Sequence, residues 1–232
     1  MCSLVLLTAA SALLAPAEAS SPNLVRLGSP DASWQLEFEF TAPQRISVSL
    51  PGQVQPQLFW YMLYKVTNNT ARERIFFPTF EVVYQTSDSI GRVEADMGIN
   101  PAVFAAIKQR HAKGYPFLIE PVRAIGRLLQ GEDNAVTSVA IWPTFDDRAD
   151  RFSMYVAGLS GQTQLVPNPN YDPALPEAQQ QTLPDGTSIS ITLNPRLFTL
   201  RKTLKIDYQL PGDPISHRTV SPVELAHTWV MR

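Results

Sequence analysis

Residues 58–66 read LFWYMLYKV, and this stretch decides the fold class of the 232-residue chain. Apolar side chains occupy both its odd and its even positions, whereas a strand with one wet face alternates apolar and polar residues. We therefore expect a central β-strand that is covered on both faces. The triplet NNT at 68–70 suits a turn, and a second apolar run follows it. Together these features predict a long hairpin over Leu58–Tyr84.

Outward from this stretch, period-two alternation dominates. From Trp34 to Phe40 apolar residues alternate with polar ones, and Ile189, Ile191 and Leu193 share one face of another expected strand. The 20 prolines suit short strands joined by loops better than a helical bundle. We expect a mainly β fold, an immunoglobulin-like β-sandwich of about nine or ten strands with a helical insertion. Further strands are expected at residues 46–50, 135–142, 151–157, 200–210 and 228–231.

One helix is expected, over residues 101–113. Asn100 can cap it, Pro101 fits its first position, and Val103, Phe104 and Ile107 form a short apolar stripe. His111 lies near its basic C-terminal end, where a surface charge explains it better than a role as a ligand. Residues 122–129 fit a helical turn or a strand equally well. The helical insertion therefore lies near residues 100–130.

The segment 161–186 is rich in proline and glutamine. It predicts a long loop, and loops beyond about 15 residues tend to be functional or disordered. We expect it to be the contact surface of the protein.

The N-terminal residues have the pattern of a secretory signal. An apolar run at 4–15 precedes the small-x-small site Ala17-Glu18-Ala19. We expect a signal peptide over residues 1–19, a single β-sandwich domain over 20–232, and a location in the periplasm or outside the cell. No Lys or Arg precedes Arg26, so either the true start lies upstream of Met1 or the signal is weak. Cleavage would remove Cys2, the one cysteine, which excludes thiol catalysis.

Charge and hydropathy narrow the classes of partner. Lys and Arg number 19 against 21 Asp and Glu, for a net charge of −2. Binding to nucleic acid needs a basic excess or a basic stripe, so we expect no nucleic-acid partner. The apolar run at 4–15 is shorter than the roughly 20 residues that span a membrane, and no later run approaches that length. We expect no transmembrane segment.

No pattern of catalytic residues stands out. His111, His217 and His227 form no H-x-H or H-E-x-x-H pair. Residues 158–161, GLSG, are one residue short of the serine-hydrolase elbow and indicate a turn. Residues 131–134, GEDN, are acidic and would repel phosphate. The sequence predicts no enzyme and no cofactor.

Three aspartates, Asp146, Asp147 and Asp150, crowd one expected loop and are the candidate metal ligands. Carboxylates suit calcium. Their spacing is not that of a known calcium loop, and Arg148 and Arg151 lie among them. Ion pairs on a solvated loop therefore explain them better than a metal site.

Aromatic residues cluster at 59–61, FWY, and at 76–77, FF. Such clusters can stack on sugars, but on strands they more often pack against both faces of a sheet, so we expect core. Asn68-Asn69-Thr70 matches the glycosylation sequon, although the backbone geometry of a turn explains it as well.

The segment 61–70, YMLYKVTNNT, resembles the strand and turn of bacterial immunoglobulin-like domains. Four later segments are similar to an uncharacterised family of secreted β-sandwich proteins from planctomycete-type bacteria. These segments are GEDNAVTSVAIW (131–142), DRFSMYVAGLSG (150–161), RKTLKIDYQLPGD (201–213) and WVMR (229–232). The resemblance implies export and a β-sandwich, and it transfers no functional residues.

The sequence thus predicts an exported, non-catalytic protein of the periplasm or cell envelope that acts by contact with another macromolecule, a protein or a polysaccharide. A carbohydrate- or calcium-binding module is the alternative, since sandwiches often carry such sites. A hydrolase with a carboxylate pair assembled by folding remains a third hypothesis.

Overall fold

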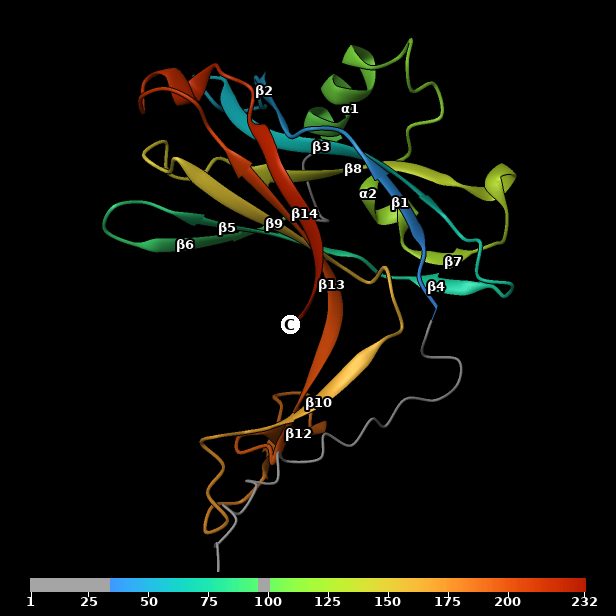
Figure 1. Cartoon of the computed structure of the whole chain (residues 1–232), viewed down its shortest axis with the longest axis vertical. Helices are drawn as coiled ribbons and strands as arrows, with labels where there is room; N and C mark the ends of the chain where they lie inside the picture. Colours follow the sequence, from blue (N-terminus) through green and yellow to red (C-terminus); the bar gives the residue numbers. More distant parts are fainter. Residues whose placement is uncertain (1–33, 96–100) are drawn as a thin grey trace, which may run out of the picture.

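The computed structural model describes residues 34–95 and 101–232 (Figure 1). The expected signal peptide, residues 1–19, and the expected cap Asn100 lie outside these ranges. The described residues form a mainly β fold, as predicted, with fourteen strands. This exceeds the expected nine or ten because short strands also form where alternation is too brief to predict one.

The first sheet is built around β3 (Gln57–Thr67). One edge of β3 pairs with β8 (Val136–Pro143). The other edge pairs with β2 (Gln44–Val48) and then with β1 (Glu37–Phe40). All five residues from Trp60 to Tyr64 are at most 3% exposed. The predicted burial of both faces of this strand is therefore confirmed.

The second sheet is antiparallel and packs face to face with the first. Five of its six strands are, in spatial order, β6 (Ile90–Glu94), β5 (Thr79–Gln85), β9 (Arg151–Ala157), β13 (Leu197–Gln209) and β14 (Val223–Met231). The sixth, β10 (Thr163–Pro167), pairs with the first residues of β13. Alternate residues such as Phe80, Met154 and Ile206 point inward and share one core cluster with Trp60 and Met62 of β3. This arrangement is a sandwich of two sheets over a common apolar core.

The hairpin predicted over Leu58–Tyr84 is wrong, because β3 lies in the first sheet and β5 in the second. Between them β4 (Arg74–Phe76) pairs with β7 (Gly126–Leu128). The buried Asn68 amide donates hydrogen bonds of 2.8 Å to the main-chain oxygens of Arg72 and Leu128. These bonds hold the chain after β3 against β7. In a hairpin, the chain would instead have turned back and paired with β3. Alternation reveals which face of a strand is buried but not which strand it pairs with.

Helices cover the other face of the first sheet. Val103, Phe104 and Ile107 of α1 (Pro101–Arg110) pack in one cluster with Tyr61 and Leu63 of β3. The helix predicted over 101–113 is confirmed up to Arg110, after which residues 111–114 form turns. The segment 122–129, expected to be a helical turn or a strand, contains one of each, because α2 (Pro121–Ala124) is followed by β7. None of the helices in the described ranges has the length and apolar character needed to cross a bilayer.

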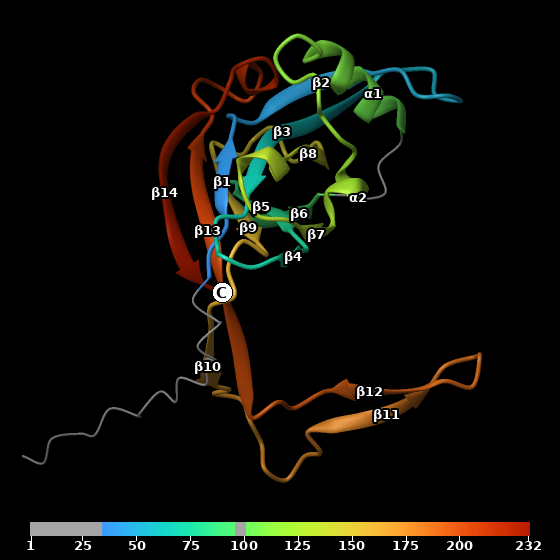
Figure 2. The same ribbon diagram turned by 90° about the vertical axis from the view of Figure 1, so that its right-hand side faces the viewer.

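A long arm leaves the sandwich between β9 and the middle of β13 (Figures 1 and 2). We define the arm as residues 163–200. It begins as β10 (Thr163–Pro167), paired with the first residues of β13, and continues as a hairpin of β11 (Ala178–Thr182) and β12 (Ser188–Thr192). The prediction of a loop over 161–186 is therefore wrong. The Gln and Thr residues between the prolines are free to pair in an antiparallel ladder, and β11 forms there.

Candidate functional site

The arm is tied together at its root by side-chain amides. Asn168 Nδ2 donates to the carbonyl oxygen of Pro195 at 2.8 Å. Asn194, which is 7% exposed, donates from Nδ2 to the carbonyl oxygens of Asp172 at 2.7 Å and Leu175 at 3.2 Å. Its Oδ1 accepts a bond from the Asp172 main-chain N–H. These bonds satisfy the main chain at the bend, so the hairpin is held at a defined junction.

The hairpin itself is exposed on both faces. Every residue of β11 and β12 is exposed, and Figure 2 shows the hairpin turning sideways, away from both sheets. Gln179 lies opposite Ile191 and Gln181 opposite Ile189, so these four side chains share one face. Leu193 continues that face and is 58% exposed. We call Ile189, Ile191 and Leu193 the apolar face of the arm.

The sequence predicts a sandwich strand with these three residues on one face, whereas the structure places that strand in the arm with every residue exposed. The signal that could have placed them correctly is the partner strand. Residues 178–182, AQQQT, bring no large apolar side chain to the pairing. A hairpin with only one apolar strand cannot supply its half of a sandwich core.

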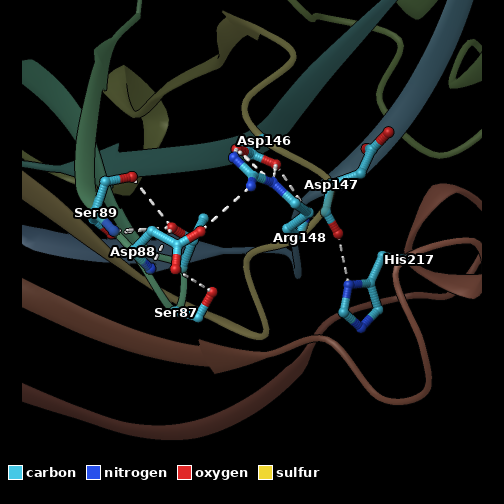
Figure 3. Close-up of polar contacts among 8 residues, drawn as sticks. Ser87, Asp88, Ser89, Asp146, Asp147, Arg148 and His217 are labelled. Carbon is cyan, nitrogen blue, oxygen red and sulfur yellow. Dashed lines mark hydrogen bonds and ion pairs between the residues drawn. The ribbon is translucent and has the colours of Figure 1, made fainter.

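The candidate metal ligands lie in the loop between β8 and β9, and Figure 3 shows two of them, Asp146 and Asp147. Arg148 binds the Asp146 carboxylate with Nη2 at 2.6 Å and also approaches Asp88 at 3.5 Å. The Arg148 side chain lowers the pKa of Asp146 to about 2. Asp147 Oδ2 accepts a bond of 2.7 Å from Arg218 Nε. The side chain of Asp150 is 76% exposed.

Asp146 and Asp147 therefore bind different arginines, and the three aspartates do not converge on a common centre. Within the ranges 34–95 and 101–232, no cluster of three or more His, Cys, Asp or Glu side chains could hold a metal ion. The arrangement is a set of ion pairs that join the loops at this end of the sandwich.

His217 is a buried polar side chain at the end of the sandwich where the loop between β8 and β9 lies. Its ring is fully buried, with Nδ1 2.8 Å from the carbonyl oxygen of Asp147 and Nε2 3.1 Å from that of Gly212. Carbonyl oxygens only accept hydrogen bonds, so both contacts are hydrogen bonds at once only when both ring nitrogens carry a proton. His217 thereby fastens the loop before β14 to the loop before β9. It is placed to clamp loops and has no access to solvent.

The remaining sequence candidates have structural roles. Ser160 Oγ donates to the carbonyl oxygen of Trp34 at 3.0 Å, and Ser160 also forms a bridge with Gln35, so GLSG is a bend tied to the chain just before the first sheet. Trp60, Tyr61 and Phe76 are buried core, whereas Phe77 is 65% exposed. Asn68, the sequon asparagine, is fully buried. His111 is not a simple surface charge, because its Nε2 lies 2.9 Å from Tyr61 Oη.

A second feature is a hollow over the end of the second sheet, on the face turned away from the first. Two adjoining cavities of about 540 and 350 Å³ both include Gln85 and Arg151 in their walls. Strand register places Gln85, Arg151 and Gln209 side by side on β5, β9 and β13. This row of amide, guanidinium and amide groups can hydrogen-bond a polar ligand.

Comparison with family models, with curated proteins and with solved structures gave no match for this chain. The resemblance to secreted planctomycete-type proteins and the immunoglobulin-like strand order therefore stay predictions.

Proposed function

We propose that this protein is an exported, non-catalytic β-sandwich that binds a protein partner in the periplasm or cell envelope through the apolar face of its arm. The observation that carries the proposal is the exposure of Ile189, Ile191 and Leu193 on a hairpin that leaves the sandwich. Contiguous exposed apolar side chains on a soluble surface mark interaction sites. An apolar surface suits a protein partner better than a polysaccharide.

The energetics of the hairpin support this proposal. An isolated two-stranded hairpin is marginally stable in water, and β11 and β12 pair only with each other among the described strands. Full burial of an Ile or Leu side chain contributes about 1.5–3 kcal/mol. A partner that covers the apolar face would therefore stabilise the hairpin as it binds, and the amide bonds at the root present that face in a fixed place.

Site-specific photo-crosslinking in the cells that make the protein tests this proposal. A photo-reactive residue at Leu193 is compared with one at Val122 on α2, because both side chains are 58% exposed. We expect a discrete adduct with a different protein at 193 and none at 122. Adducts at 122 alone, no adduct at either site, or an adduct at 193 only with a second copy of the chain would each contradict a separate protein partner.

The hollow on the second sheet supports a second candidate function, the binding of a carbohydrate. Gln85, Arg151 and Gln209 present planar hydrogen-bonding groups of the kind that recognise sugar hydroxyls. The binding of calcium has no such support, because the carboxylates of Asp146 and Asp147 form ion pairs with Arg148 and Arg218. Oligosaccharides that bind there must raise the melting temperature of the wild type but not of Arg151→Ala. Equal shifts in both proteins, or none, would remove this candidate.

A further inference from the structure

The outer edge of β12 carries free main-chain groups at known positions. Residues 177 and 193 are joined by the bond from Leu193 N–H to the Glu177 oxygen, and residues 183 and 187 by the bond from Leu183 N–H to the Thr187 oxygen. Hydrogen-bonded pairs alternate along an antiparallel ladder, so the odd-numbered residues of β12 face β11. The N–H and C=O groups of Ser188, Ser190 and Thr192 therefore point outward, on an edge where no other described strand pairs.

This edge lacks the features that keep edge strands from pairing. Proteins blunt such edges with charged side chains, prolines or bulges. The edge strands of the second sheet follow this rule, since β14 carries Glu224 and His227 and β6 carries Arg92 and Glu94. By contrast, β12 reads SISIT, and residues 186–194 contain neither a charged residue nor a proline. Nothing on the strand repels or blocks a second strand.

The edge is also complementary to itself. The sequence SISIT has the same pattern of polar and apolar residues in both directions about Ser190. In an antiparallel pair centred there, Ser190 lies opposite Ser190 of a second copy, Ile189 opposite Ile191, and Ser188 opposite Thr192. In this register Ser188, Ser190 and Thr192 form the hydrogen-bonded pairs, and these are the residues whose main-chain groups point outward. Three such pairs allow about six main-chain hydrogen bonds between the two copies. The two Ile–Ile pairs fall at the closer, non-hydrogen-bonded positions.

We propose that β12 pairs edge to edge with β12 of a second copy of this chain, so that two arms join in a four-stranded antiparallel sheet. Three or more strands with an apolar face form a stable sheet where a lone hairpin does not. The two-fold axis through Ser190 places both apolar faces on one side of this sheet. The proposal uses the edge of the arm, whereas the function proposed above uses its face, so either can fail without the other.

Two substitutions at Ser190 test the interface by sedimentation equilibrium of the purified chain. Ser190→Pro removes the N–H group that points outward. The bonds between β12 and β11 are kept, because the N–H of Ser190 does not take part in them. We expect the wild type and the matched control Ser190→Ala to be dimers, and the proline variant to associate at least about tenfold more weakly. A wild type that stays monomeric at submillimolar concentration, or a dimer that Ser190→Pro leaves unchanged, would overturn the proposal.

Disulfide trapping reports the register independently and does not depend on the proline variant folding. In a Cys2→Ser background, Ser190→Cys is compared with Gln180→Cys, which lies at the centre of the opposite edge of the hairpin. Directly opposed strand residues lie within reach of a disulfide. Rapid oxidation to a covalent dimer at 190 and not at 180 is expected. Trapping at 180 alone, or at neither position, would show that the β12 edge is not the contact.

Discussion

At the scale of single residues, buried polar side chains hold the loops of this protein in place. Asn68, Asn194 and His217 are each less than 10% exposed and each bonds main-chain oxygens from distant parts of the sequence. Leaving such an acceptor without its donor costs more than the hydrogen bond contributes when it is made. None of these roles could be predicted from the sequence, because the partner is a carbonyl group that any residue can supply.

Removal of His217 should destabilise the fold. His217→Ala removes the ring that lies 2.8 Å from the carbonyl oxygen of Asp147 and 3.1 Å from that of Gly212, and it opens a small cavity, so we expect a loss of about 2–4 kcal/mol in the free energy of unfolding. The control is His227→Ala, whose side chain is 61% exposed and should change stability by no more than about 0.5 kcal/mol. Urea denaturation measures both, and equal effects would show that His217 is no clamp.

His111 should make stability depend on pH. Burial, and then the charge of Arg110, lower the pKa of His111 in the folded protein. The unfolded chain therefore binds this proton more readily, and the free energy of unfolding should fall as the pH drops below the ordinary histidine value of about 6.5. An NMR titration of the His111 ring should give a midpoint below that of a model peptide. A midpoint at or above the peptide value would contradict the burial seen here.

At the scale of elements, the two-faced strand β3 organises the sandwich. One of its faces lies in the core between the sheets and the other lies under α1. Trp60→Ala should therefore cost about 3–5 kcal/mol, as removal of a buried aromatic side chain does. Phe77→Ala, at a position that is 65% exposed, should stay within about 0.5 kcal/mol of the wild type. Thermal unfolding compares them, and equally mild effects of both substitutions would contradict the place of Trp60 in the core.

The elements also show what a sequence can and cannot predict here. The run 58–66 and the stripe of Val103, Phe104 and Ile107 predicted their elements because periodicity reports burial directly. The pairing of β5 could not be predicted, since it depends on which strand lies alongside. The exposure of Ile191 follows only when its polar partner strand, residues 178–182, is read together with it. The expectation that the segment 161–186 is the contact surface stays a prediction, and the apolar face proposed above lies on β12, the strand that follows this segment.

At the scale of the whole molecule, the sandwich and the arm are separate structural parts. The sandwich has a complete core of its own, and the hairpin contributes nothing to it. Pro167 and Leu197 lie directly opposite each other, so an Asn-Gly turn can replace residues 168–196. We expect this shortened protein to melt close to the wild-type temperature, by circular dichroism, while losing both arm contacts. A collapse of the fold would show that the arm is part of the structural unit.

The central claim, that the apolar face of the arm is covered when the protein is at work, is tested most directly by the accessibility of a cysteine. In a Cys2→Ser background, Leu193→Cys and Val122→Cys are labelled with a maleimide in the purified protein and in the cells that make it. We expect equal labelling of both in the purified protein, since the two side chains are equally exposed at 58%, and protection in cells at 193 alone. Equal labelling of the two positions in cells would contradict the claim.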